Sequence, residues 1–407
     1  MSETVDVSRT GYVAVLSQKN FLALWLGSLV GRTGDYLLSA AMIAFVFTLT
    51  GSGFDTGLIT AAFYVPVFLF APYFGRVVDN NDRRKLMILA TLLEVVSGLA
   101  LYFSILLGAA VLPMAFVCVF AISTFGLLVS VCRSSVIPVL VSENELATAN
   151  SLQQTTSQLS RIFGYAAGLA GFVFIRDTAG IVLVVVAAFL ASVLFFAFMR
   201  FVSPIAHGRS RRSADGLKYI AGNRLFLEIS IFLTVANFTG AGMIFLPAIM
   251  SNDILGAGNT GFALILVALA AGTIAGNYVV TLVKVRRMVG KIMILSFAAN
   301  AVLYVAFAFS AHISYAIAVT FIIGIVEGIS SVPFIALLQA KTPPERMGSV
   351  LAGMSMLLLG GGSVSMVLSG GLVETLGVQR VYIIFAILLA AVAALGTTVK
   401  GLREASY

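Results

Sequence analysis

Long apolar runs alternate with short polar connections along the chain. Each run holds about 20 residues or more, which is enough for a helix to cross the hydrocarbon core of a bilayer. Strict alternation of apolar and polar residues is absent, and the runs exceed the roughly 10 residues of a membrane β-strand. The pattern predicts an all-α integral membrane protein with twelve transmembrane helices, at residues 21–47, 56–77, 86–108, 111–137, 149–175, 179–202, 225–249, 259–283, 289–310, 313–338, 347–373 and 379–399.

The composition favours the same class of protein. Of the 407 residues, 60% are hydrophobic and 10% are charged, and the mean hydropathy is +1.05. Soluble domains carry about 25% charged residues. The residues before position 21 are polar and lack a cleavable apolar run, so we expect no signal peptide.

Several kinds of chemistry are disfavoured by what the sequence lacks. Cys118 and Cys132 lie in one apolar run, and only two histidines occur, which argues against a disulfide or a metal centre. No G-x-x-x-x-G-K-[ST] sequence is present, so ATP-driven transport is not expected. We expect a protein that is not an enzyme and that needs no metal or organic cofactor.

Lysine and arginine positions predict the orientation. With the N-terminus inside, 21 of the 25 basic residues fall in inner loops or at inner helix ends, as expected for cytoplasmic loops. Arg176 and Arg380 fall outside, and Arg32 and Arg161 lie within spans. We therefore expect a bacterial-type cytoplasmic membrane and cytoplasmic termini. The net charge of +8 then reflects topology rather than nucleic-acid binding.

Internal similarity indicates two related halves. The basic turn at 75–85 resembles 276–287, and the segment from Ser134 resembles the one from Ser330, both at about half the chain length. Repeated bundles are common in transporters. The prediction is an N-terminal six-helix bundle at 1–202, a basic cytoplasmic linker at 203–224 and a C-terminal six-helix bundle at 225–407.

Charged residues inside the spans are candidates for proton coupling, because a charge in lipid is costly unless it faces a bundle interior or a water path. Asp35 is the leading candidate, with Arg32 one helical turn away and Arg161 as a partner from a second helix. Glu94 and Glu327 lie well within other spans. An arginine that moves relative to such a carboxyl group would load or release its proton.

These charges also allow structural interpretations. Arg32 and Asp35 could form a permanent ion pair, and Glu94 and Glu327 could have hydrogen-bonded structural roles. Arg133 lies near the predicted inner end of its span, where we expect it to snorkel to the headgroups. Glu228 is only a few residues into its span, so we expect it at the interface.

Uncharged polar residues within spans predict a substrate cavity. One stripe at helical spacing comprises Asn150, Gln154, Gln158, Arg161 and Tyr165. Since such a stripe is unfavourable in lipid, it should line the central cavity. From the second half we add Asn237, Asn300 and the aromatic Phe238, and we expect that half to supply a more apolar wall.

The turn at 75–85 resembles the major facilitator superfamily, whose second and third helices are joined by G-x-x-x-D-[RK]-x-G-x-[RK]-[RK]. The chain matches at Gly75, Asp79, Arg84 and Lys85, adds Arg83, and differs at Asn80 and Asp82. The resemblance implies that Gly75 lets helices two and eleven approach. It also implies that Asp79 locks the outward-facing state against the start of span eleven, near 347–349. Alternatively, the basic residues serve only as topology anchors.

A finer resemblance points to the drug and siderophore exporter branch, which includes macrolide-efflux and enterobactin-exporter proteins. It rests on Gly34 followed by Asp35, the Gly-Ser-Gly turn at 51–53, Pro66 and the link at 137–152. The antiporter pattern G-x-x-x-G-P-x-x-G-G is met only in part, with Leu169 at the proline position.

This branch implies proton-coupled export of small amphipathic compounds, either drugs or siderophore-like metabolites, by alternating access. The expected partners are the substrate, protons and membrane lipids, with the proton gradient as energy source, no nucleic acid and a monomeric protein. The alternatives are a lysophospholipid-like lipid transporter without proton antiport and a non-transporting receptor or scaffold.

Overall fold

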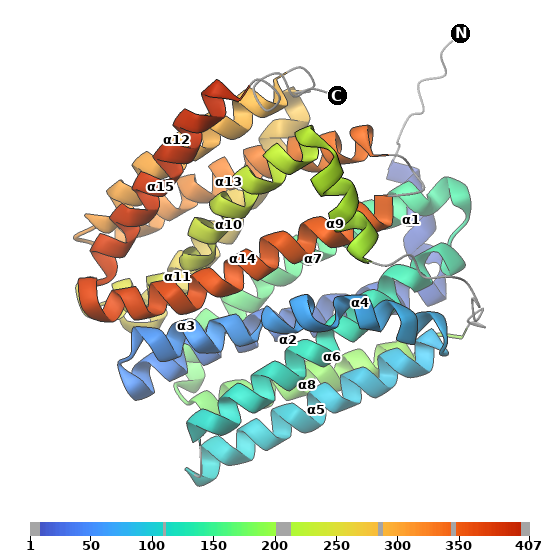
Figure 1. Cartoon of the computed structure of the whole chain (residues 1–407). Helices are drawn as coiled ribbons and strands as arrows, with labels where there is room; N and C mark the ends of the chain where they lie inside the picture. Colours follow the sequence, from blue (N-terminus) through green and yellow to red (C-terminus); the bar gives the residue numbers. More distant parts are fainter. Residues whose placement is uncertain (1–8, 109–110, 201–212, 284–287, 343–346, 400–407) are drawn as a thin grey trace. The chain divides into compact units, whose positions relative to one another are not determined.

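A computed structural model describes residues 9–108, 111–200, 213–283, 288–342 and 347–399. Within these ranges every regular element is a helix and no strand occurs (Figure 1). The α-helices are α1 (Arg9–Ser17), α2 (Lys19–Thr50), α3 (Gly53–Ala62), α4 (Val65–Asp79), α5 (Arg83–Leu107), α6 (Val111–Leu140), α7 (Leu146–Ala170), α8 (Thr178–Phe198), α9 (Ser213–Gly222), α10 (Arg224–Ile249), α11 (Gly258–Val283), α12 (Val289–Ala308), α13 (Ile313–Lys341), α14 (Met347–Leu376) and α15 (Val378–Thr398). A 3₁₀ turn (Glu143–Glu145) precedes α7, and single π-helical turns (Gly171–Ile175 and Met250–Ile254) follow α7 and α10.

The predicted fold class is confirmed. In the described part of the chain, 12 helices are long and apolar enough to cross a membrane, and each overlaps one of the twelve predicted runs. The second run is divided between α3 and α4 by a short turn at Phe63 and Tyr64. Pro66 lies in the first turn of α4, where its missing N–H costs no helical hydrogen bond.

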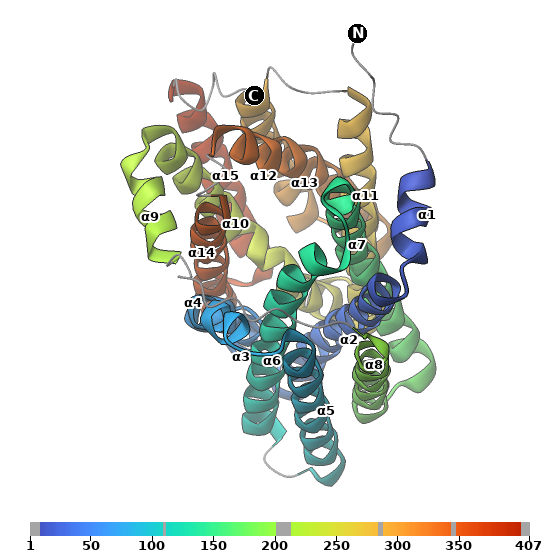
Figure 2. The same cartoon turned by 90° about the vertical axis from the view of Figure 1, so that its right-hand side faces the viewer.

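Two short helices lie in segments that the hydropathy pattern left unassigned. The first is α1, and the second is α9, which falls inside the predicted linker at 203–224 and packs against α14 (Figure 2). Residues 203–212 of that linker lie outside the described residues, as do parts of the repeat matches at 284–287 and 343–346.

Contacts group the chain into two compact units. Unit 1 comprises Met1–Leu38, Phe70–Gly164 and Asp177–Ser210, and unit 2 comprises Ser39–Leu69, Tyr165–Arg176 and Arg211–Tyr407. Three of the unit boundaries fall within helices, namely α2, α4 and α7. The two sequence halves at 1–202 and 225–407 remain a prediction from internal repetition.

In unit 1, α5 packs between α6 and α8, and the three helices run side by side in both views (Figures 1 and 2). In unit 2, α11 packs closely against α13 through Gly272, Gly276, Gly324 and Gly328. A Cβ atom on Gly276 would lie 2.1 Å from the carbonyl oxygen of Ile325, so only glycine permits this approach.

Unit 2 holds a second close contact, between α3 and α14. A Cβ atom on Gly57 would lie 2.2 Å from the carbonyl oxygen of Met366. At the N-terminus of α3, the Glu374 carboxylate accepts hydrogen bonds from Ser52 Oγ at 2.6 Å and from the Phe54 N–H at 3.3 Å. A carboxylate is favourable at this end of a helix.

Candidate functional site

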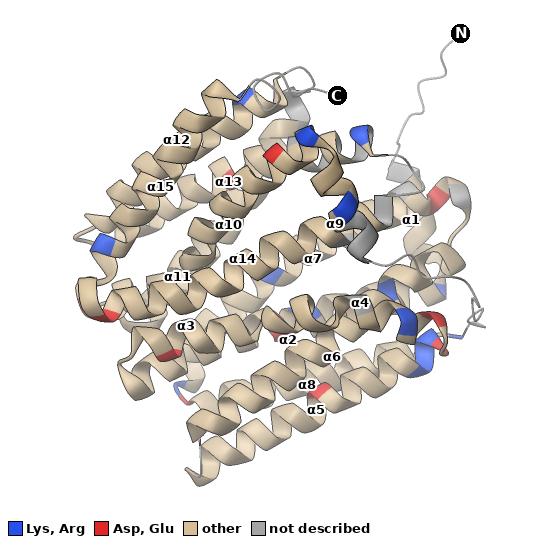
Figure 3. Cartoon of the chain, viewed as in Figure 1, with Lys and Arg blue, Asp and Glu red and all other residues tan. Residues whose placement is uncertain are grey.

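Charged residues lie mostly near the ends of the helices, and few occur along their middle sections (Figure 3). The exception that concerns function is in unit 1, where Asp35 of α2 interacts electrostatically with Arg32 of the same helix, with Glu94 of α5 and with Arg133 of α6. We call these four residues the charge cluster. Every side chain of the cluster except Arg133 was a predicted proton-coupling residue.

The two carboxyl groups of the cluster converge on Gly126 of α6. A Cβ atom at this position would lie 3.0 Å from Glu94 Oε1 and 4.0 Å from Asp35 Oδ1. Glu94 is only 4% exposed, whereas Asp35 is half-buried. Glycine therefore leaves the space that two side chains from different helices occupy together.

The two guanidinium groups of the cluster are held by serines. Arg32 Nη1 donates to Ser157 Oγ of α7, and Arg32 Nη2 donates to Ser130 Oγ of α6 at 3.5 Å. Arg133 Nη2 donates to the same Ser130 oxygen at 2.9 Å. Among the described residues, no ion pair within 4.0 Å joins either arginine to Asp35 or Glu94. The structure therefore contains no direct Arg32–Asp35 pair.

Arg133 was placed wrongly by the sequence interpretation, which expected it to reach the headgroups. It is 3% exposed, and its Nε has no hydrogen-bond partner among the described residues. The reason is the length of α6, which continues to Leu140 and so leaves Arg133 about two turns inside the helix. The apolar residues after Arg133 are the signal that could have placed it correctly.

Arg161 of α7 lies one turn beyond Ser157, whose hydroxyl accepts a hydrogen bond from Arg32. Its Nε and Nη2 are buried and have no hydrogen-bond partner in the described part of the chain. The direct partners of the charge cluster on α7 thus include Ser157, which the predicted stripe omitted.

The predicted polar stripe on α7 is unevenly exposed. Asn150 and Gln154 are exposed, Gln158 and Arg161 are half-buried, and Tyr165 is 6% exposed. Close approach of α7 to α2 depends on Gly164, where a Cβ atom would lie 2.4 Å from that of Tyr36. The expectation that this stripe lines a substrate cavity stays a prediction.

Unit 2 contains the remaining predicted cavity residues. On α10, Asn237 lies against Gly362 of α14, and the Phe238 ring contacts the Phe385 ring edge-to-face, with centroids 6.3 Å apart. On α12, Asn300 is 8% exposed, and its Oδ1 has no hydrogen-bond partner among the described residues.

Glu327 of α13 is half-buried and interacts electrostatically with Tyr304 of α12. The Tyr304 ring contacts that of Tyr382 edge-to-face, with centroids 6.1 Å apart. Tyr382 is fully buried, and its hydroxyl has no hydrogen-bond partner among the described residues. Sequence reasoning missed both tyrosines, because an aromatic residue within an apolar helix has no distinguishing pattern.

The turn at 75–85 contains Gly75 and Asp79 in the last turns of α4 and the three basic residues at the start of α5. Asp82 is the N-cap of α5 and accepts hydrogen bonds from the backbone N–H groups of Arg84 at 3.0 Å and Lys85 at 3.2 Å. Asp82, which stands where the motif has glycine, therefore caps the N-terminus of α5.

The first two arginines of α5 hold neighbouring helix ends in unit 1. Arg83 Nη1 donates to the carbonyl oxygen of Ser135 at 3.0 Å, and Arg84 Nη2 donates to that of Ala197 at 2.6 Å. Cations are favourable at the carbonyl ends of helices. These two residues therefore do more than anchor topology. The Asp79 side chain makes no hydrogen bond or ion pair with the described residues of its own unit, and its role as a lock against 347–349 stays a prediction.

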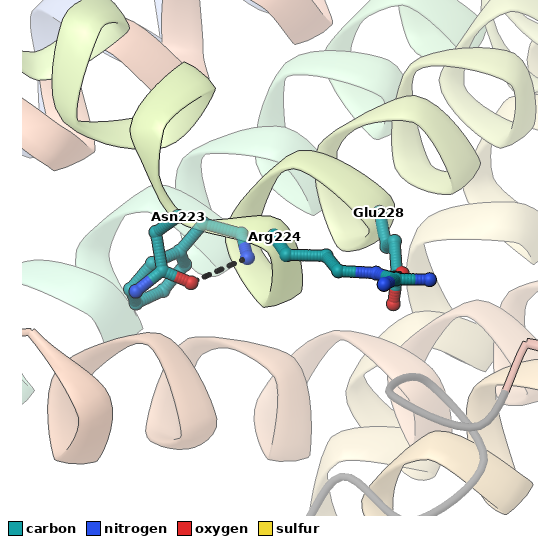
Figure 4. Close-up of polar contacts among 4 residues, drawn as sticks. Asn223, Arg224 and Glu228 are labelled. Atoms are coloured by element: carbon teal, nitrogen blue, oxygen red, sulfur yellow. Dashed lines mark hydrogen bonds and ion pairs between the residues drawn. The ribbon is translucent and has the colours of Figure 1, made fainter.

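Two carboxylates outside the spans have structural contacts. Glu145 accepts hydrogen bonds from Ser142 Oγ and N–H and from Gln18 Nε2, and the pKa of this carboxyl is lowered, first by the Ser142 hydroxyl. Glu228 pairs with Arg224 at 2.9 Å near the N-terminus of α10, beside the capping residue Asn223 (Figure 4). The Glu228 side chain is 19% exposed, which suits an interfacial position.

Comparison with known proteins places these features in context. A family model described as Major Facilitator Superfamily matches residues 24–364. Macrolide efflux protein A of Streptococcus pyogenes is 26% identical over 142 residues. That alignment spans 35% of this chain and 35% of the relative.

Solved structures share the fold at low sequence identity. The nucleoside transporter NupG has a TM-score of 0.72 at 14% identity, with 93% of this chain and 98% of that chain covered. A POT family transporter in complex with a thioalcohol-conjugated peptide has a TM-score of 0.77 at 11% identity, covering 93% and 95%. A bacterial homologue of the human lysosomal transporter Spinster has a TM-score of 0.73 at 13% identity, covering 93% and 95%.

Proposed function

Because the chain belongs to the Major Facilitator Superfamily, we propose that this multi-pass membrane transporter couples proton movement to the export of small amphipathic compounds by alternating access. Its energy source is the proton gradient, and it needs no organic cofactor. It works as a monomer in a bacterial-type cytoplasmic membrane, with both termini in the cytoplasm. The distribution of basic residues supports that orientation.

The charge cluster carries the proposal. Four ionisable side chains lie together in membrane-spanning helices, where charges are retained mainly for function. Their carboxyl groups and guanidinium groups are close enough to interact but do not form ion pairs. An arrangement of this kind has two accessible states, because a carboxyl group can either keep its proton or, once ionised, accept a hydrogen bond from an arginine. Asp35 is the leading protonation site, with Glu94 beside it.

Export and an amphipathic substrate are supported by other observations. The partial likeness to a macrolide efflux protein favours export. In unit 2 the half-buried Phe238 ring packs on the buried Phe385, and it is an aromatic side chain of the kind that lines pockets for apolar ligands. Asn237 and Asn300 add amide groups that could orient a polar part of the substrate.

The test is transport by the purified full chain in proteoliposomes, with an imposed pH gradient and a substrate panel that includes a labelled macrolide. Wild type should accumulate substrate only with the gradient, and Asp35→Asn should reduce this accumulation to the level of empty liposomes. The reason is that an amide at this position cannot exchange a proton. Asp253→Asn, at an exposed carboxyl group, should transport like wild type.

Each contrary outcome has a meaning. Unchanged gradient-driven transport in Asp35→Asn contradicts the assignment of the protonation site. Transport that ignores the pH gradient favours a lipid-type transporter, which can be checked with a labelled lysophospholipid. Absence of flux for the whole panel favours a non-transporting membrane protein.

A further inference from the structure

Ser130 of α6 is the point where the two guanidinium groups of the charge cluster meet. Arg32 Nη2 and Arg133 Nη2 both donate to its Oγ, at 3.5 and 2.9 Å. A hydroxyl oxygen has two lone pairs and can accept both bonds. Two like charges that converge on one oxygen in a mostly buried site repel each other, so a specific contact is required to hold them there.

A stronger acceptor is available nearby and is not used. Charge-assisted bonds from arginine to an ionised carboxylate are about twice as strong as bonds between neutral groups. Asp35 lies within electrostatic range of both arginines, yet neither makes an ion pair with it within 4.0 Å. Arg133 even leaves its buried Nε without a partner among the described residues. This geometry is expected when the carboxyl pair holds a proton and attracts arginine less.

We propose that Ser130 is a positioning residue for proton coupling: it holds Arg32 and Arg133 away from Asp35 and Glu94 while one of these two carboxyl groups, which approach each other beside Gly126, holds a proton. The proposal rests on the proposed proton-coupled function. It identifies Ser130 as the residue that keeps the arginines off the carboxyl pair while the pair is protonated. Ser157 assists by accepting from the other nitrogen of Arg32.

The proton step is an exchange of hydrogen bonds. On release, the carboxyl O–H bond breaks and the proton passes to a water molecule on the open side of the membrane. The resulting carboxylate accepts an arginine N–H, and that N–H leaves Ser130 Oγ. On loading, a proton from water re-forms the O–H bond, and the guanidinium group returns to Ser130.

Other ionisable groups around the pair are few. Tyr36 of α2 interacts electrostatically with both arginines, and Arg161 of α7 lies one turn from Ser157. On α6, Cys132 is adjacent to Arg133 in sequence and fully buried. The sequence of α8, which packs against α5, contains no ionisable side chain. Protonation changes within the charge cluster are therefore assigned to Asp35 and Glu94.

The experiment follows the carboxylic acid band by infrared difference spectroscopy of the purified full chain as a function of pH, without substrate. In Ser130→Ala the arginines lose their shared acceptor and move to the carboxyl pair, which favours its ionised form. We expect the midpoint for loss of the band to move about 1 pH unit or more toward acid. Asp35→Asn and Glu94→Gln should each remove part of the band, which identifies its origin.

Controls separate positioning from general damage. Ser134→Ala, one turn further along α6, removes a hydroxyl that, among the described residues, bonds only to the Ser130 carbonyl oxygen, and this variant should titrate like wild type. Ser130→Thr keeps a hydroxyl and should restore the wild-type midpoint. If Ser130→Ala does not fold, Ser157→Ala replaces it, since it frees Arg32 and should shift the midpoint in the same direction.

Equal midpoints for wild type, Ser130→Ala and Ser157→Ala would overturn the inference. Because this measurement needs no substrate, it is independent of the transport assay. A wild type without gradient-driven transport contradicts the proposed function, whereas a proton-coupled wild type with an unshifted Ser130→Ala contradicts only the role of Ser130.

Discussion

Gly126 shows how one missing side chain can define a site. It lies on α6, where the Glu94 and Asp35 carboxyl groups approach from α5 and α2. A methyl group there would meet Glu94 Oε1 at 3.0 Å, which is tight enough to displace that oxygen by a few tenths of an ångström. The position therefore tests proton coupling without removing any ionisable group.

For Gly126→Ala we expect gradient-driven transport to fall while the fold is retained. Alanine is favoured over glycine in a helix by up to about 1 kcal/mol, which offsets part of the local crowding. The measurements are thermal unfolding and proteoliposome transport on the same preparation. Gly240→Ala is the matched control, because nothing lies within 4 Å of its added Cβ, and transport should be unaffected. Loss of transport in both variants would mean that the effect is not local to the carboxyl pair.

At the scale of elements, the sequence predicted the helices well and their contacts poorly. Lipid forces each span to be a long apolar helix, so hydropathy was sufficient for all twelve. The side-chain partners depend on which face of each helix meets a neighbour. Arg32 was correctly identified as a candidate, but its bonds to Ser130 and Ser157 rather than Asp35 could not be foreseen, since small serines occur throughout such helices.

The contact between α3 and α14 yields the prediction at this scale. A Cβ atom on Gly57 would lie 2.2 Å from a backbone oxygen, which cannot move independently of α14. We expect Gly57→Ala to destabilise unit 2 by about 2 kcal/mol, a typical cost of overpacking. The measurement is the midpoint of thermal or denaturant unfolding. Gly371→Ala, whose Cβ would have an ordinary 3.8 Å contact with Phe54, should change stability little; an equal loss there would refute the packing argument.

For the whole molecule, topology is the property that the sequence predicts most directly. Basic residues at helix ends stay in the cytoplasm because moving them across the bilayer is unfavourable. The division of the chain into units 1 and 2 was not predicted, because hydropathy carries no information about where a helix changes its packing partners. Asp82 is a similar case, since its capping role depends on the start of α5 rather than on the motif.

Orientation can be measured with cysteines placed at exposed positions. Arg380→Cys, near the start of α15, should react with a membrane-impermeant maleimide in intact cells. Lys341→Cys, at the end of α13, should react only after permeabilisation. The native Cys118 and Cys132 are buried and should give a low background. The opposite labelling pattern would reverse the predicted topology.

The glycine contacts between α11 and α13 have a practical consequence for studies of motion. Cβ atoms on Gly272 and Gly324 would lie 2.1 and 2.3 Å from backbone oxygens of the facing helix, so the two backbones are in close contact and we expect these helices to move together. We therefore expect the distance between α11 and α13 to stay constant. Spin labels on the outer faces of these two helices should keep one separation through the transport cycle, and they supply the reference against which distance changes elsewhere can be calibrated.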